Sequence, residues 1–125
     1  MPDEHPIKKR IYIAGPYCPL GTTLHDAPRV ANHNVQRAIE VFHLLRSMGY
    51  MPFVPHLSHY LHIEGPEDYE GYWLDYDMTI LERWAEAIFM LEGWENSAGS
   101  KMEHDKAIDL GIQIIYENGH KNVRR

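Results

Sequence analysis

One carboxylate, Glu103, stands on the apolar face of an expected helix, close to the helix start. The helix is predicted over residues 97–110 and ends at Gly111, and Glu103, Ala107 and Leu110 recur on one of its faces. A carboxylate on such a face needs a reason, because burial penalises its charge. Two interpretations stay open: an acid at the edge of the stripe that reaches water and suits the helix dipole, or a nucleophile that faces a ligand.

The turn that precedes Glu103 combines small and hydroxyl residues. Ser97 is a suitable N-cap for the helix, and this role alone would explain it. Gly99 and Ser100 follow within the same turn. Backbone N–H groups and hydroxyls at a helix start can also bind a phosphate, so Ser97 and Gly99 are candidate ligand contacts.

Three histidines raise the possibility of a metal site. His56, His59 and His62 recur every third residue, and two of them could reach one ion from a helical turn. Zinc sites usually also include a cysteine or carboxylate, so we predict no metal and no cofactor, and expect His56 and His59 to contact a substrate instead. Cys18 has no histidine partner indicated in the sequence, which disfavours a thiol nucleophile.

Buried-strand patterns alternate with helical patterns along the chain. Strands are predicted at 11–14, 51–54, 87–91 and 112–116, and helices at 35–45, capped by Asn32 or Asn34 and stopped by Gly49, at 72–84 and at 97–110. This order predicts a single-domain, doubly wound α/β fold, Rossmann-like or flavodoxin-like, with a mostly parallel sheet of four to five strands. Ligands of such folds bind beyond the carboxyl ends of the strands, so the long connections 17–29 and 55–71 should help to build the site.

Composition limits the class of protein. The 125 residues suit one domain, 1–125, with flexible tails at 1–9 and 118–125. The net charge of −6 argues against binding to a nucleic-acid polymer, which requires an electropositive face, but a mononucleotide is compatible with it. A lone cysteine, the lack of a signal peptide and the lack of an 18-residue apolar run predict a cytoplasmic protein without membrane contact.

Three sequence pieces together resemble the nucleoside 2-deoxyribosyltransferase superfamily. They are the segment Ile-Tyr-Ile-Ala-Gly-Pro at 11–16, Asp77 in the second helix, and Ser97-Ala98-Gly99 followed by Glu103. The similarity extends from residue 11 to about residue 116. The motifs of this chain are most similar to those of the 2′-deoxynucleoside 5′-phosphate N-hydrolases and related small nucleotide N-glycosidases.

This resemblance implies a role for each matching residue. Glu103 would attack the anomeric carbon of a sugar, Asp77 would assist proton transfer, and Tyr12 would hold Glu103 by a hydrogen bond. Ser97, six residues before Glu103, would bind a 5′-phosphate, and Gly15, Pro16 and Tyr17 are expected to contact the substrate. On the residues alone, Asp77 also fits a solvated helix face, because Asp75 lies two positions away.

The implied reaction is hydrolysis of the N-glycosidic bond of a nucleoside 5′-monophosphate through a covalent glycosyl-Glu103 intermediate. A deoxyribosyltransferase and an inactive nucleotide-binding module are the alternatives. The loop after Gly15 departs from the Gly- and Arg-containing phosphate loop of the hydrolases. Arg29 or Lys101 could replace that arginine, or the substrate could be an unphosphorylated nucleoside.

Aromatic residues cluster around the start of the second helix. The cluster comprises Tyr69, Tyr72, Trp73 and Tyr76. Such rings could stack on a base, but at helical spacing they favour a subunit interface. The resemblance likewise implies a homo-oligomer, a dimer or larger, with shared active sites.

Overall fold

A four-stranded parallel sheet forms the centre of the computed structural model, which describes residues 8–17, 23, 25–57 and 72–119. The strands are β1 (Lys9–Ala14), β2 (Tyr50–Phe53), β3 (Ala87–Met90) and β4 (Gln113–Tyr116). Their order is β2-β1-β3-β4, so β1 lies between two neighbours. Within this register Tyr12 lies opposite Phe53 on one side and opposite Ile88 on the other.

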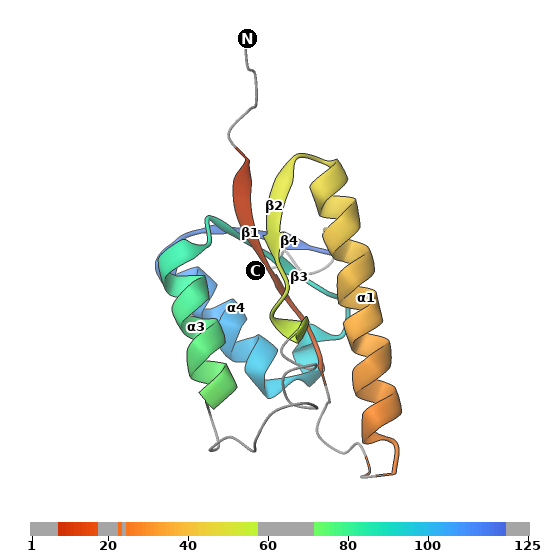
Figure 1. The fold of residues 1–125 in the computed structure, drawn as a ribbon. Helices are drawn as coiled ribbons and strands as arrows, with labels where there is room; N and C mark the ends of the chain where they lie inside the picture. Colours follow the sequence, from red (N-terminus) through yellow and green to blue (C-terminus); the bar gives the residue numbers. More distant parts are fainter. Residues whose placement is uncertain (1–7, 18–22, 24, 58–71, 120–125) are drawn as a thin grey trace.

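Helices cover both faces of the sheet (Figure 1). Helix α1 (Ala27–Ser47) packs on one face, and α3 (Tyr72–Trp84) and α4 (Ala98–Leu110) lie on the other. Alternate residues of β1 therefore enter two different cores: Ile11 and Ile13 pack with α1, whereas Tyr12 and Ala14 face the other pair of helices. The chain is thus a doubly wound α/β domain with four strands, as predicted.

The start of α1 was wrongly predicted. The helix begins at Ala27 with Asp26 as its N-cap, and not at Asn32 or Asn34. Pro28 in the first turn suits a helix start, because its missing N–H would have no helical partner there. A polar turn leads in, where the Ala27 N–H donates to the Thr23 carbonyl at 2.9 Å. The pattern of apolar residues alone misses these first turns.

Other boundaries differ only slightly from expectation. Lys9 is the first residue of β1 and does not belong to the amino-terminal tail, of which residues 1–7 lie outside the described part. Two short 3₁₀ turns, η1 (Pro55–Leu57) and η2 (Trp94–Asn96), follow β2 and β3. Both lie where strands end, at the edge of the sheet at which a ligand is expected. Among the described helices, none is long and apolar enough to cross a membrane.

Candidate active site

Glu103 and Tyr12 meet in the core between the sheet and α4. Tyr12 is fully buried, and Glu103 is only 7% exposed. The Tyr12 hydroxyl donates a hydrogen bond of 2.5 Å to Glu103 Oε2. Glu103 therefore does not reach water at the edge of an apolar stripe, which was one of its two sequence interpretations. It is a buried carboxyl held by a residue of the central strand.

A second carboxyl, Asp77 on α3, lies close enough to influence both groups. Its charge raises the pKa of Tyr12 and of Glu103, after larger effects of burial. Asp77 Oδ1 is buried and has no hydrogen-bond partner among the described residues. Asp77 is consequently not part of a solvated face. Three elements, β1, α3 and α4, bring these three side chains together.

Both carboxyls retain protons to unusually high pH. Burial raises the pKa of Asp77 to about 7. The pKa of Glu103 is raised to about 8, mainly by burial, while the hydrogen bond from Tyr12 lowers it and the charge of Asp77 raises it. Ordinary Asp and Glu side chains have already lost their protons by about pH 5. Around neutral pH the pair therefore holds a proton that it can give to a neighbouring molecule, and such raised values are typical of functional sites.

The start of α4 forms the second part of the site. Ser97 is the N-cap of α4, and its Oγ accepts a hydrogen bond of 3.2 Å from the Ser100 N–H. The Ser97 hydroxyl hydrogen remains available for another acceptor. Apart from its chain neighbours and its own helix backbone, no atom of the described residues lies within 4 Å of the position that a Cβ of Gly99 would occupy, so the backbone of this turn can be approached closely.

Ser100 is a feature that sequence patterns did not single out as a site residue. It is only 2% exposed, and its Oγ has no hydrogen-bond partner within the described ranges. A buried hydroxyl without a partner is uncommon, because it forfeits its interactions with water. Spacing could have placed Ser100 on the same helix face as Glu103, but only the structure shows that its hydroxyl lacks a partner.

The loop after β1 is tightly packed. A Cβ on Gly15 would lie 2.6 Å from the Leu91 side chain, so glycine is required here by packing. The Pro16 carbonyl lies 3.1 Å from His56 Nε2, and the Tyr17 carbonyl accepts a hydrogen bond of 2.8 Å from Asn34 Nδ2. Gly15, Pro16, Tyr17 and His56 are thus brought together at the ends of β1 and β2. Their contacts include one another, Asn34 of α1 and the segment after β3.

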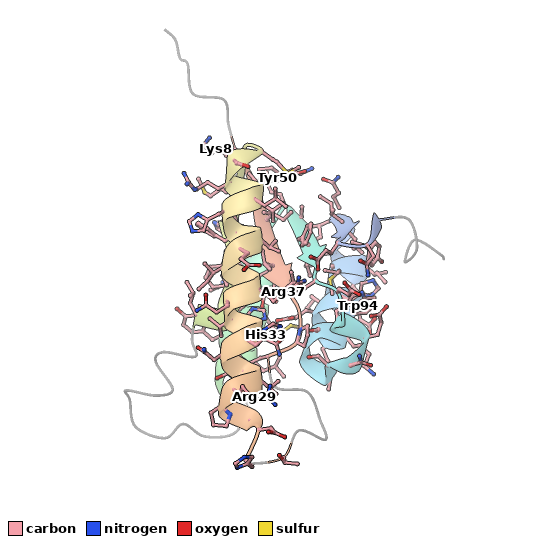
Figure 2. All side chains as sticks on the ribbon, turned by 90° about the vertical axis from the view of Figure 1, so that its right-hand side faces the viewer. Lys8, Arg29, His33, Arg37, Tyr50 and Trp94 are labelled. Atoms are coloured by element: carbon pink, nitrogen blue, oxygen red, sulfur yellow. The ribbon has the colours of Figure 1, made fainter. Side chains whose placement is uncertain are left out.

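The two cations that could replace the phosphate-loop arginine, Arg29 and Lys101, are both exposed. Arg29 lies in the first turns of α1 (Figure 2), where its side chain is 75% exposed and pairs with Asp26 at 3.3 Å. Lys101 is exposed on α4. Arg37, also labelled in Figure 2, donates to the Glu117 carboxylate at 2.7 Å. None of these cations contributes to the shifted pKa of Glu103 or Asp77.

An aromatic stack fixes the turn that leads to Ser97. Trp94 of η2 stacks on His104 of α4 with ring centroids 4.3 Å apart. His104 Nε2 and the Tyr116 hydroxyl are 2.7 Å apart, within hydrogen-bonding distance. The stack joins η2, α4 and β4. No local sequence signal indicated it, since the three residues are distant along the chain.

Several residues considered in the sequence lie outside the described residues. They are His59, an expected substrate contact, and His62, Cys18 and Tyr69; the side chains of Tyr72 and Trp73 are likewise not described. Within the described ranges no three His, Cys, Asp or Glu side chains form a group that could hold a metal ion.

Comparison with known proteins identifies the family. The chain belongs to the family described as a domain of unknown function, DUF4406, whose profile matches residues 9–116. None of the curated proteins matches the chain significantly. The matched segment includes β1, α3 and α4, and with them Tyr12, Asp77 and Glu103.

Proposed function

We propose that this protein hydrolyses the N-glycosidic bond of a nucleoside 5′-monophosphate, with Glu103 as nucleophile. The observation that carries the proposal is the buried Glu103 carboxyl, which Tyr12 holds at 2.5 Å and whose pKa the charge of the half-buried Asp77 raises. Enzymes that cleave a bond at an anomeric carbon usually use two carboxyl groups with different roles. The family match supplies no activity of its own, so the proposal rests on this geometry and on the resemblance of its motifs to the nucleotide N-hydrolases.

The first step forms a covalent intermediate. Burial gives Glu103 the higher pKa of the pair, so the reactive form arises when the Glu103 proton passes to Asp77. The hydrogen bond from Tyr12 to Glu103 Oε2 lowers the pKa of Glu103 and thereby favours this form, in which Glu103 is ionised and Asp77 carries the proton. The other oxygen of Glu103 attacks the anomeric carbon, and the carbon–nitrogen bond breaks. Its electron pair passes to the base nitrogen, and the Asp77 proton neutralises the leaving base. The products of this step are a free base and a glycosyl ester on Glu103.

The second step releases the sugar. The Asp77 carboxylate takes a proton from water as the water oxygen attacks the anomeric carbon. The bond to Glu103 breaks and returns its electron pair to the carboxylate. One nucleotide and one water thus yield a free base and a sugar 5-phosphate, and Asp77 regains its proton.

The Ser97 turn is the proposed position of the 5′-phosphate. Six residues of helix place Ser97 about 9 Å along the axis from Glu103, which suits a sugar 5-phosphate laid between them. The Ser97 hydroxyl and the free N–H groups of the α4 start would donate to the phosphate oxygens. Ser100, whose buried hydroxyl has no partner among the residues that the structure describes, is a further donor in this turn.

Release of free base from a panel of nucleoside 5′-monophosphates and the matching nucleosides tests the proposal. We expect Glu103→Gln to lower the rate by about 10³-fold or more, since the nucleophile is lost while the shape is kept. The exposed Glu82 of α3 provides the matched control, because Glu82→Gln should leave the rate unchanged. Unchanged base release by a folded Glu103→Gln protein would refute the assignment.

The fate of the intermediate separates a hydrolase from a transferase. Both reactions share the first step, so mass spectrometry of quenched mixtures should find a sugar phosphate attached to Glu103 in either case. Adding a second free base then decides: a hydrolase keeps producing sugar phosphate, whereas a transferase produces a new nucleotide. Monophosphate binding without any base release would indicate the inactive binding module.

A second copy of the chain is proposed to complete the site. Tyr76 of the expected interface cluster is 45% exposed on α3, one position before Asp77. An exposed aromatic ring beside a candidate catalytic residue is typical of a surface that another subunit covers. Sedimentation of the native protein and of Tyr76→Glu tests this proposal, which requires the native protein to be oligomeric and the variant to dissociate.

A further inference from the structure

His56 is a buried imidazole that the proposed reaction does not use. It is 5% exposed and lies in η1, immediately after β2. Its Nε2 lies 3.1 Å from the Pro16 carbonyl. Its Nδ1 is buried and has no hydrogen-bond partner in the described part of the chain. The polar contacts of the side chain are therefore with the loop after β1, where the backbone of Gly15 also acts on the imidazole.

The contact determines which ring nitrogen carries the proton. A carbonyl oxygen can only accept a hydrogen bond, so Nε2 must be the donor. Burial lowers the pKa of His56, which favours the neutral ring. The neutral ring with a protonated Nε2 leaves Nδ1 bare. His56 thus acts on the loop as a neutral N–H donor.

Two elements hold consecutive carbonyls of this loop. His56 of η1 donates to the Pro16 carbonyl, and Asn34 of α1 donates to the Tyr17 carbonyl at 2.8 Å. Gly15 lies so close to Leu91, the residue after β3, that a methyl group would not fit. The loop is therefore clamped by α1, by η1 and by the residue that follows β3.

The clamped loop supports the turn that leads into α4. A Cβ on Gly93 would lie 3.5 Å from Cγ of Pro16, so the Pro16 ring lies close to the Gly93 backbone. Gly93, with φ of 92°, is the N-cap of η2, and the Ser97 N–H donates to the Trp94 carbonyl at the end of the same turn. A movement of Pro16 would thus reach Ser97 through three residues of η2.

We propose that His56 is a positioning residue for the phosphate side of the site, acting through the Pro16 carbonyl and the η2 turn on Ser97. The inference rests on the proposed function, because it takes Ser97 as the phosphate contact. Glu103 is held separately, by Tyr12 of the central strand. Loss of the His56 donor should therefore impair binding of the phosphate more than the chemical step.

Substitutions at His56 should separate KM from kcat. We expect His56→Phe to raise KM for a nucleoside 5′-monophosphate about tenfold, the equivalent of one buried hydrogen bond, with kcat altered by less than about threefold. The preference for nucleotide over nucleoside should fall by a similar factor. Glutamine can place an N–H near the position of Nε2, so His56→Gln should restore most of the loss. The exposed His33 of α1, labelled in Figure 2, is the matched control, and His33→Phe should change neither constant.

Two measurements remain informative even if no nucleotide is cleaved. Nitrogen-15 chemical shifts of the imidazole should show a protonated Nε2 and a bare Nδ1 at neutral pH. Calorimetry with ribose 5-phosphate should show weaker binding to His56→Phe than to the native protein. A protonated Nδ1 with bare Nε2, a loss of kcat at constant KM, or equal binding of ribose 5-phosphate by both proteins would overturn the inference. Absence of base release by the native protein, with these binding results intact, would refute only the hydrolase proposal.

Discussion

Replacement of Glu103 with glutamine should make the folded protein more stable at alkaline pH. The folded protein holds a proton on Glu103 up to a pKa of about 8, whereas an ordinary glutamate releases it near 4.5. The stability that this proton contributes is complete below the unfolded value and is lost as the pH rises through the folded value. Glutamine is always neutral and can still accept the hydrogen bond from Tyr12, so it avoids this loss.

The magnitude follows from the two proton affinities. At about 1.4 kcal/mol for each tenfold change in affinity, the difference corresponds to about 5 kcal/mol of unfolding free energy at pH 9. Relaxation around the charge and entry of water reduce this figure, which is an upper limit. Even about 1 kcal/mol would be measurable. At pH 4 both proteins carry a neutral group here and should have nearly equal stability.

Urea unfolding at pH 4, 7 and 9, followed by tryptophan fluorescence, measures the effect. The native protein should lose stability relative to Glu103→Gln as the pH rises, with the difference appearing between about pH 5 and pH 9. The Glu82→Gln protein lacks an exposed carboxylate of α3 and should parallel the native protein. If Glu103→Gln were no more stable than native at pH 9, Glu103 could not be the buried, proton-holding group described above.

Three further predictions concern the supports of the site. Tyr12→Phe removes the hydrogen bond that lowers the Glu103 pKa, so that pKa should rise in carboxyl-selective NMR titrations, and a fall would contradict the described contact. Gly15→Ala should destabilise the fold by about 1–3 kcal/mol through overpacking, and Leu91→Ala in the same chain should relieve part of that cost beyond additivity. Gly111→Ala should cost about 1 kcal/mol in thermal unfolding, because Gly111 has φ of 72° at the end of α4; an unchanged Tm would count against this conformation.

The strands and helices that form the layers of the fold could be predicted from the sequence, because each follows from a local periodicity. Short apolar runs such as 11–14 are typical of strands buried on both faces, and Gly111 marks the end of α4. The first turns of α1 could not be predicted in this way. There, Pro28 and the capping residue Asp26 determine the start, while the apolar stripe becomes regular only further along.

Apart from the family resemblance, which also pointed to Tyr12 and Asp77, the candidate site could be predicted only where one residue violated its pattern. Glu103 interrupted an apolar helix face, and the structure shows it buried against Tyr12. Asp77 gave no such signal, since a carboxyl two positions from another on a helix usually faces water, and its partial burial depends on the packing of α3 beside α4. The contact of His56 with Pro16 joins residues 40 positions apart, and no local pattern encodes such a distance.

The placement of Tyr12 has a consequence for motion. Tyr12 lies in the middle of β1, bordered by β2 and β3, so exposing it requires the sheet itself to open. Hydrogen exchange of its amide should be among the slowest in the protein and should approach the limit set by global unfolding. The short η2 turn before Ser97 has few hydrogen bonds to break and should exchange much faster. The site would then combine a carboxyl fixed by the slowest-opening strand with a neighbouring turn that is held mainly by side-chain packing and opens far more often.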